Sequence, residues 1–501
     1  MQLWRILLFT INLVLGPARR RLLLGVFLAG LGYLLFLPAF EGRGEVQQLE
    51  ALIQFSQTGA VRVSEDAPFP AEFSTHDGPW PASWLSVSRP GYASWAMIRT
   101  GADDVETGDD ASVQPSSSAA FHARPLTLVV LAPVRALVSD WSWRAQVRLY
   151  RLILWSAAML GFALAVEAAF RSGLLNEHGA VIMAAWPFMF PQFFAQMTSV
   201  GGDALGLCCV AFACAAFMTL SRRNDLPASL GLGLALGLGV WANTLLVTLW
   251  LGLALYLGWR SWRLHRAHAL DGEWLVLRVF ALSLALLIAT GWVVFAVFSS
   301  GPSEMTPVLG PGFAERLWAT IATFSADGGA SEILPGPGWR LISLGLLVVI
   351  LARWELNWRA LPPLAQAPAF ILPVFTLSAL LLGLQGYASG FGDLHMLAAF
   401  LGLATALCCR TSGLAMALVV LGLSGALAQG LFQASVFSGC AVYDPQLGRY
   451  GYEGARCVLD LDALGAVSAP LAAVKALMIG GLSAASALFT LWRQSARQRE
   501  Y

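Results

Sequence analysis

Residues 190–206 read FPQFFAQMTSVGGDALG, and this stretch joins two long apolar segments of the chain. It contains one carboxylate, Asp203, which directly follows two glycines. Aspartate is a favoured N-cap residue, so Asp203 is a good N-cap for the helix that the next segment predicts. A carboxylate between two apolar segments is also a candidate for chemistry, because ionisable groups in such surroundings are costly. Which interpretation holds depends on what the rest of the sequence places around it.

The composition is that of a membrane protein. The chain has 501 residues, of which 57% are hydrophobic and 12% charged, and its mean hydropathy is +0.66. Soluble domains carry about 25% charged residues. A net charge of +1 without a basic tract argues against a nucleic-acid partner. We therefore expect an all-α polytopic membrane protein.

Apolar segments long enough to cross a bilayer recur along the chain, and we count about twelve of them, each near the ~20 residues that a span needs. Their centres lie near residues 30, 160, 187, 211, 234, 251, 287, 345, 376, 401, 421 and 482. The predicted regions are an N-terminal cytoplasmic or interfacial segment (1–21), the first transmembrane helix (22–40), a first exoplasmic loop (41–147), a transmembrane core (148–432) with an exoplasmic loop at 299–337, another exoplasmic loop (433–470), and the last transmembrane helix with a basic cytoplasmic tail (471–501).

The arginines predict the orientation, because cytoplasmic loops are enriched in Lys and Arg. Three arginines at 19–21 precede the first span, which places the N-terminus in the cytoplasm. Further arginines fall in alternate loops, at 222–223, 260–266, 353–359, 410 and 493–499. The C-terminus is then cytoplasmic as well, and Asp203 lies on the exoplasmic side with the long polar loops.

Two segments of the first exoplasmic loop predict interfacial helices. GEVQQLEALIQFSQTG (44–59) has apolar residues at helical spacing, which is typical of an amphipathic helix at the membrane surface. PLTLVVLAPVRALVSD (125–140) is apolar but is interrupted by Pro133 and Arg135, so it is too short and broken to span. Between them, residues 60–120 are polar and lack a pattern, which indicates a surface segment with partial disorder.

The seven cysteines form two groups. Five lie in or beside apolar runs, where cysteine acts as a small hydrophobic residue. Cys440 and Cys457 lie in the last large exoplasmic loop, where an oxidising compartment would favour a disulfide between them. Two unpaired thiols are the alternative.

Titratable and polar residues gather on the predicted exoplasmic side. These are Glu41, Glu45, Asp203, Tyr387, Asp393, His395 and Lys475. Each has a structural alternative. Glu45 can offset the positive end of its helix, His395 can be a satisfied buried group, and Lys475 can extend to the interface from the final span.

Taken together, these residues match one kind of chemistry. A carboxylate can take the proton of an acceptor hydroxyl or amine. Cations and helix N-termini can hold the charge of a departing phosphate. The sequence has no nucleotide-binding glycine loop, no HExxH and no GxSxG elbow. This combination favours transfer from a lipid-phosphate donor to a polar acceptor.

The order of the motifs resembles the GT-C superfamily of polytopic glycosyltransferases, including protein O-mannosyltransferases, lipid A aminoarabinose transferases and related bacterial membrane proteins. GEVQQLEALIQFSQTG is similar to the segment after their first span. Glu45 stands in the glutamate place, Gly44 where an aspartate is usual, and Gln48 where a histidine is common. HARPLTLVVLAPVRALVSD is similar to "HPPLYYLLLAP" and retains His122, Pro125 and Pro133.

Three further segments carry the resemblance. FPQFFAQMTSVGGDALG is similar to "PQFLF…NNDAL", with glycines for the asparagines and Asp203 retained. LGLALGLGVWANT (232–244) is similar to "GLALLTK", and Asn243 occupies the usual lysine position. LQGYASGFGDLH (384–395) stands where "QGRYLFP" is expected and retains Gln385, Gly386 and Tyr387.

The resemblance implies a GT-C-like bundle of about twelve transmembrane helices in a bacterial inner membrane, with its active face in the periplasm. It implies transfer of a sugar from a polyprenyl-phosphate donor, with inversion, to a glycan, lipid or protein acceptor. Carried over by position, Glu45 and Asp203 are the catalytic candidates. The substrate-binding candidates are Glu41, Gln48, His122, Tyr387, His395 and Lys475.

No cofactor is certain, and a divalent metal ion stays open. The expected partners are the donor, the acceptor and membrane lipids. The alternative is a catalytically degenerate GT-C-fold subunit or a lipid-glycan-binding membrane protein.

Overall fold

The computed structural model describes residues 17–37, 39, 42, 45–59, 124–190, 192–299, 366–384, 391–408, 420–428, 430, 443–444, 449–450 and 468–497. The helices are α2 (Ala18–Phe36), α3 (Glu45–Thr58), α5 (Pro125–Val138), α6 (Trp143–Arg171), α7 (Glu177–Ala184), α8 (Trp186–Met189), α9 (Gln192–Met197), α10 (Asp203–Arg222), α11 (Leu226–Ala242), α12 (Val247–Arg266), α13 (Gly272–Ser299), α16 (Pro368–Leu384), α17 (Ala398–Cys408) and α21 (Ser468–Arg497). Two 3-10 helices are η3 (Thr244–Leu246) and η6 (Phe391–Leu397). One antiparallel pair, β1 (Tyr443–Asp444) with β2 (Arg449–Tyr450), pairs Tyr443 with Tyr450.

The all-helical class is confirmed, whereas the count of about twelve spans is not. Within the described residues, four helices are long and apolar enough to cross a membrane: Trp143–Arg171, Asp203–Arg222, Thr244–Arg266 and Gly272–Gly291. The helices predicted within 44–59 and 125–140 are both present, as α3 and α5. The span predicted near residue 345 lies outside the described residues.

The apolar run near residue 187 is not one spanning helix. It folds as three short helices, α7, α8 and α9, which are almost wholly buried. Pro187 lies at the start of α8, where its missing N–H interrupts no hydrogen bond. Phe190, which precedes Pro191 in the sequence, is extended with φ −134° and ψ 95°, as a residue before proline prefers. These turns bring the chain to the start of α10.

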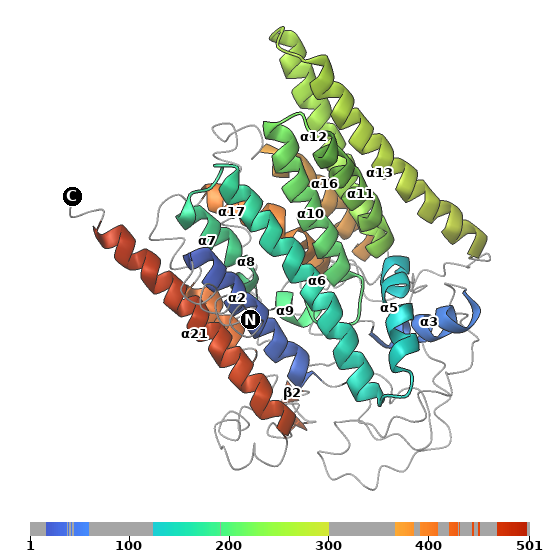
Figure 1. Ribbon diagram of the computed structural model, residues 1–501, viewed down its shortest axis with the longest axis vertical. Helices are drawn as coiled ribbons and strands as arrows, with labels where there is room; N and C mark the ends of the chain where they lie inside the picture. The colour runs from blue at the N-terminus through green and yellow to red at the C-terminus, as the bar shows by residue number, and fades with distance from the viewer. Residues whose placement is uncertain are drawn as a thin grey trace, which may run out of the picture.

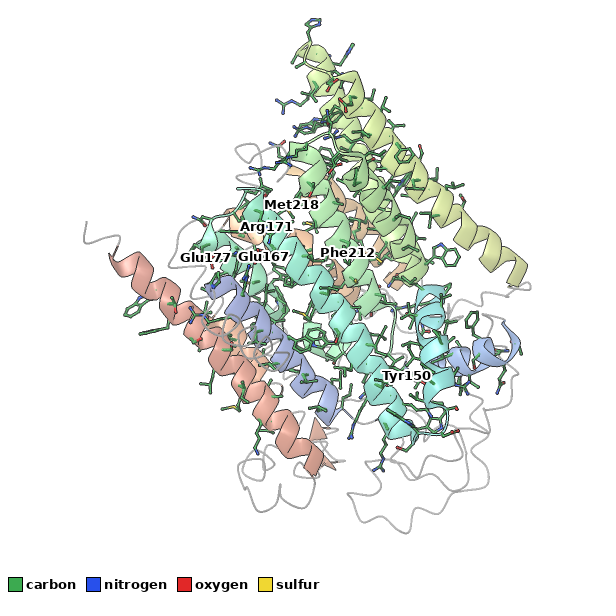
Figure 2. The ribbon with its side chains drawn as sticks, viewed as in Figure 1. Tyr150, Glu167, Arg171, Glu177, Phe212 and Met218 are labelled. Carbon is green, nitrogen blue, oxygen red and sulfur yellow. The ribbon has the colours of Figure 1, made fainter. Side chains whose placement is uncertain are left out.

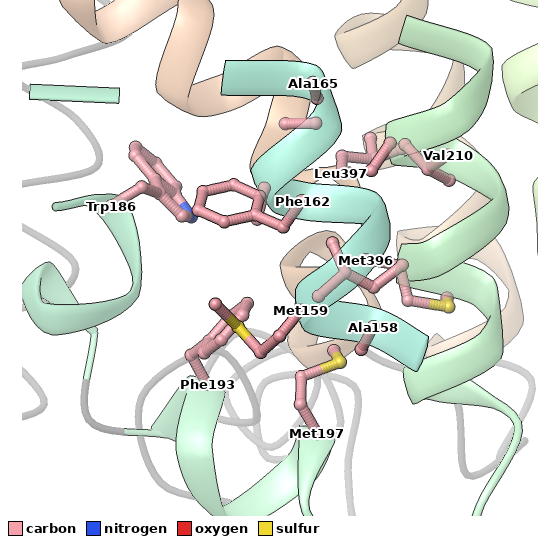
Figure 3. Close-up of a cluster of buried hydrophobic side chains, with 14 of the residues drawn as sticks. Ala158, Met159, Phe162, Ala165, Trp186, Phe193, Met197, Val210, Met396 and Leu397 are labelled. Carbon is pink, nitrogen blue, oxygen red and sulfur yellow. The ribbon is translucent and has the colours of Figure 1, made fainter. Parts of the chain in front are cut away.

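The centre of the bundle is a layer of large apolar side chains. Figure 3 shows Met159 and Phe162 of α6 near Trp186 of α8 and Phe193 of α9, with Met396 of η6 beside α10. All five side chains are at least 95% buried. This layer fixes the positions of α9 and of the start of α10 relative to α6.

The first and last described helices pack side by side, as Figure 1 shows for α2 in blue and α21 in red. A Cβ at Gly480 would lie 2.7 Å from both the Ala29 amide nitrogen and the Gly25 carbonyl oxygen. A Cβ at Gly25 would lie 2.8 Å from the Gly480 carbonyl oxygen. Small residues of this kind let helix backbones approach closely where hydrophobic burial cannot drive association.

An ion-pair cluster holds the N-terminal end of α2. The Arg19 guanidinium bonds Glu167 of α6 at 3.0 Å and also pairs with Glu177 of α7. It stacks 3.7 Å from the Phe170 ring centroid. Figure 2 shows Glu167, Arg171 and Glu177 gathered at this end of α6, far from Tyr150 near its other end. Arg222, from the end of α10, donates to the Arg171 carbonyl oxygen at 3.1 Å, so the predicted basic segments at 19–21 and 222–223 share one end of the bundle.

We expect Gly480→Leu to destabilise the protein by about 1–3 kcal/mol or more, because backbone atoms cannot move away from the added side chain. Thermal unfolding of the purified protein in detergent measures this change. Gly258→Leu on α12 is the matched control, since a Cβ there meets no atom within 4 Å. Equal melting temperatures for the two variants would contradict the close α2–α21 contact.

Candidate functional site

Two buried carboxylates, far apart in the sequence, meet at the connection between α9 and α10. Glu45 is the first residue of α3 and is fully buried, and Asp203 is the first residue of α10 and is 4% exposed. The Val200 amide, three residues before Asp203, donates to Glu45 Oε1 at 2.9 Å. The two carboxylates therefore lie at one end of the bundle, on the two sides of a single turn.

Glu45 forms a fully buried ion pair with Arg151 of α6. Arg151 Nε donates to Oε1 at 2.8 Å and Nη2 donates to Oε2 at 2.5 Å, and neither side chain is exposed. The third nitrogen, Nη1, donates to the Leu37 carbonyl oxygen at the end of α2 at 2.5 Å. The Gly42 amide adds a bond of 3.3 Å to Oε2.

A carboxylate has about four lone-pair positions. Glu45 accepts bonds from Arg151 Nε, Arg151 Nη2, Val200 N and Gly42 N, which matches that capacity. This arrangement ties α2, α3, α6 and the α9–α10 turn together.

Asp203 accepts hydrogen bonds from three side chains. Arg124 Nη1 donates to Oδ1 at 2.5 Å, Gln196 Nε2 to Oδ2 at 2.8 Å, and Asn243 Nδ2 to Oδ1 at 3.3 Å. Arg124 precedes α5, Gln196 is on α9, and Asn243 follows α11. The carboxylate thus joins four segments at one point.

The N-cap prediction for Asp203 is wrong. The N-cap of α10 is Gly202, which makes no side-chain bond, and Asp203 lies in the first turn. The physical reason is that charged and amide donors surround the carboxylate and take its oxygens. Its negative charge still lies at the positive end of the α10 dipole, where it is favourable.

Arg124 is the site residue that the sequence interpretation missed. It immediately precedes α5, whose first residue is Pro125, and its side chain is 26% exposed. Its Nη1 is held by Asp203, while Nε and Nη2 bond to no residue in the part of the chain that the structure describes. The sequence feature that could have indicated Arg124 as a site residue is its position two residues after His122 in the HARPLTL motif.

Gly202 makes the approach of Arg124 geometrically possible. A Cβ at Gly202 would lie 2.1 Å from the Ala242 carbonyl oxygen and 2.2 Å from Arg124 Cδ. An asparagine, usual at this place in the resembled motif, would not fit this packing. Asn243 accepts from the Leu245 amide at 3.0 Å, capping η3, and donates to Asp203. With Asn243 at the usual lysine position, Arg124 supplies the cation beside Asp203.

Three buried glutamines on α3 and α9 are incompletely hydrogen-bonded within the part of the chain that the structure describes. Both polar atoms of Gln48, one turn after Glu45, have no hydrogen-bond partner among the described residues, although the side chain is 2% exposed. Gln192 Nε2 and Gln196 Oε1 on α9 also have no partner within the described part of the chain, and these side chains are 5% and 1% exposed. Buried polar groups are normally satisfied by protein, water or ligand.

The remaining predicted site residues are dispersed or not described. His395 of η6 is fully buried, with its ring 6.0 Å from that of Phe190 and 6.2 Å from that of Phe193. Asp393 is 2% exposed on the same element. Lys475 is exposed on α21, the helix that packs along α2. Glu41, His122, Tyr387, Cys440 and Cys457 lie outside the described residues.

Among the described residues, no group of three or more His, Cys, Asp or Glu side chains could hold a metal ion. A divalent metal at this site therefore stays a hypothesis from the sequence.

We expect Arg151→Met to destabilise the protein by about 3–5 kcal/mol, because it leaves the Glu45 carboxylate buried and unpaired. The double variant Glu45→Leu/Arg151→Met removes both charges and should recover much of that loss. Thermal unfolding in detergent measures both, and Arg148→Gln, on an exposed position of α6, is the control. An Arg151→Met protein as stable as the Arg148→Gln control would refute the anchoring role.

Comparison with known proteins gives distant similarity in fold. No protein-family model and no curated protein matches the chain. The structure is similar to ArnT from Cupriavidus metallidurans in the apo state, with 14% identity, a TM-score of 0.45, and coverage of 91% of this chain and 74% of that chain. It is also similar to ArnT from the same organism bound to undecaprenyl phosphate, with 14% identity, a TM-score of 0.42, and coverage of 83% and 74%. Both alignments cover most of this chain at low sequence identity.

Proposed function

We propose that the protein is a membrane-embedded glycosyltransferase of the GT-C type in a bacterial inner membrane. It transfers a sugar from a polyprenyl-phosphate donor to a glycan, lipid or protein acceptor on the periplasmic side. The observation that carries this proposal is the Arg124–Asp203 pair. It couples a partly exposed guanidinium to a buried carboxylate at the start of α10.

Arg124 is suited to contact the donor phosphate. Asp203 holds one edge of the guanidinium through Nη1, which orients the group and leaves Nε and Nη2 for an anion. A planar guanidinium matches phosphate oxygens in a bidentate geometry. The neighbouring N-terminus of α10 adds a favourable dipole for negative charge.

Asp203 is the catalytic candidate. In an inverting transfer, the acceptor oxygen forms a bond to the anomeric carbon while the bond from that carbon to the phosphate oxygen breaks. The acceptor proton passes to a carboxylate, and the phosphate leaves with the electron pair. Arg124 pairs with this carboxylate and would lie beside the leaving phosphate.

Glu45 is assigned the orienting role. Its oxygens are engaged by Arg151, Gly42 and Val200, so it acts through the turn that carries Asp203. The unsatisfied amides of Gln48 and Gln192 supply donors and acceptors of the kind that sugar hydroxyl groups use.

We expect Arg124→Gln to weaken binding of a polyprenyl monophosphate by about 10–100-fold, because bonds between charged groups contribute about 1.5–3 kcal/mol. Arg124→Lys should retain part of the affinity. Titration of the probe into purified protein, followed by native mass spectrometry, measures the change. Arg135→Gln is the matched control, because Arg135 lies on α5 and bonds Ser56 instead. Equal affinities for Arg124→Gln and Arg135→Gln would contradict the phosphate role.

We expect Gln48→Met to raise thermal stability and to lower sugar transfer. The change removes two buried polar atoms that have no partner among the described residues, and a buried polar atom left without a partner costs about 1–3 kcal/mol. If Gln48 were a structural residue alone, the variant would gain stability and keep its transfer rate. Unfolding temperature and product formation, measured on one preparation, separate the two cases.

A second candidate is a GT-C-fold protein that binds lipid-linked glycan without catalysis. It is favoured by the hydrogen bonds of Glu45, which occupy both carboxylate oxygens. Asp203→Asn separates it from the enzyme. In an enzyme, this variant keeps much of the probe binding and loses product formation. In a binding protein, the unaltered chain forms no product with any polyprenyl-phosphate sugar supplied.

A further inference from the structure

Four aromatic–arginine pairs line the hairpin of α12 and α13, at the end of the bundle opposite the candidate site. Each arginine follows its aromatic partner by four residues, so the two lie on neighbouring turns of one helix face. The pairs are Tyr256 with Arg260 (Nη1 to the hydroxyl, 3.0 Å), Trp259 with Arg263 (5.1 Å to the ring centroid), Trp262 with Arg266 (4.2 Å) and Trp274 with Arg278 (4.1 Å). Figure 1 shows this hairpin reaching past the ends of α6, α10 and α11.

The direction of stacking brings each guanidinium group to the level of its own aromatic ring. Helical side chains lean toward the N-terminus of their helix. α12 runs toward the hairpin tip, so Arg263 and Arg266 fold back over tryptophans that lie nearer the body of the bundle. α13 runs away from the tip, so Arg278 folds toward the tip over Trp274. The arginines of both helices therefore lie at the level of the tryptophan rings.

That level is where the exposed apolar surface ends. On α12 the exposed apolar side chains reach Leu251 and Leu255, and on α13 they resume at Val276 and Val279, all of which are 44–65% exposed. The tryptophan–arginine layer comes directly beyond them. Tryptophan concentrates at the headgroup level of a bilayer, so the stacked guanidinium groups lie among the lipid headgroups.

The arginines differ in their exposure and in the hydrogen bonds that they already make. Arg278 is 3% exposed and donates to the Leu220 carbonyl oxygen at 2.6 Å and to the Trp274 carbonyl oxygen at 2.8 Å, so it is a structural residue. Arg263 and Arg266 are exposed, and neither bonds a carboxylate among the described residues. Each guanidinium group lies over a tryptophan ring.

We propose that the α12–α13 hairpin holds the headgroup of an anionic phospholipid in the leaflet at this end of the bundle. Arg263 and Arg266 bind the phosphate, and Trp259 and Trp262 form the platform that orders them. Stacking restricts the long arginine side chains before the lipid binds, which reduces the loss of side-chain entropy on binding. This site lies at the other end of the bundle from Arg124 and does not depend on the proposed transfer reaction.

The test is lipid retention by the full-length protein in mixed micelles that contain equal amounts of phosphatidylglycerol and phosphatidylcholine, read by native mass spectrometry. The unaltered protein should retain phosphatidylglycerol in preference. Arg263→Gln/Arg266→Gln should lower that retention about tenfold or more, since each arginine near an anionic headgroup contributes on the order of a fivefold effect. Both positions are exposed, so the variant should keep its unfolding temperature.

The matched control is Arg222→Gln/Arg223→Gln, which removes two exposed arginines at the same end that lie on no aromatic ring in the described structure. It should keep the preference for phosphatidylglycerol. An equal loss in both double variants would overturn the proposal in favour of unspecific charge attraction, and no loss in Arg263→Gln/Arg266→Gln would overturn it outright. Trp259→Leu keeps every charge and should also weaken retention; unchanged retention would contradict the stacked geometry.

Discussion

The buried Glu45–Arg151 pair is the interaction on which the rest of the structure depends. It joins the end of α2 through the Leu37 carbonyl oxygen, the start of α3, the first third of α6, and the α9–α10 turn through the Val200 amide. Inside a bilayer, apolar contact alone does not select one helix arrangement, because lipid is as apolar as the helix surface. A saturated ion pair has one satisfactory geometry, and it fixes the turn from which Asp203 begins its helix.

The other end of α2 is held by the same kind of contact. Arg19 pairs with Glu167 and Glu177 there. At about 1.5 Å per residue, Arg19 and Leu37 are about 27 Å apart along the helix, close to the ~30 Å hydrocarbon core of a bilayer. Polar contacts thus hold both ends of α2, and between them α2 packs against α21 through Gly25 and Gly480. The result is a rigid frame on one side of the candidate site.

The sequence predicts the helices well where apolar length and turn chemistry determine them. α6, α10 and α13 follow from long apolar runs, and α3 and α5 from their spacing and interruptions. It also places Glu45 and Asp203 at one end of the bundle.

The sequence does not predict the partners of these two carboxylates, because Arg151 is 106 residues from Glu45 and Arg124 is 79 residues from Asp203, and no local pattern records such contacts. These partners distinguish the two carboxylates. The oxygens of Glu45 are fully hydrogen-bonded, whereas Asp203 pairs with an arginine that is partly exposed. Proline at 187 was the available signal that the apolar run there would break into short helices.

The measurement that bears most directly on the proposed function is the position of a lipid phosphate in the site. A cryo-EM structure of the full chain with a bound polyprenyl monophosphate would provide it. The proposal predicts phosphate density within hydrogen-bonding distance of Arg124 Nε or Nη2, with Nη1 still on Asp203 and the Glu45–Arg151 pair unchanged. A phosphate bound elsewhere, with Arg124 making no contact to it, would contradict the proposal.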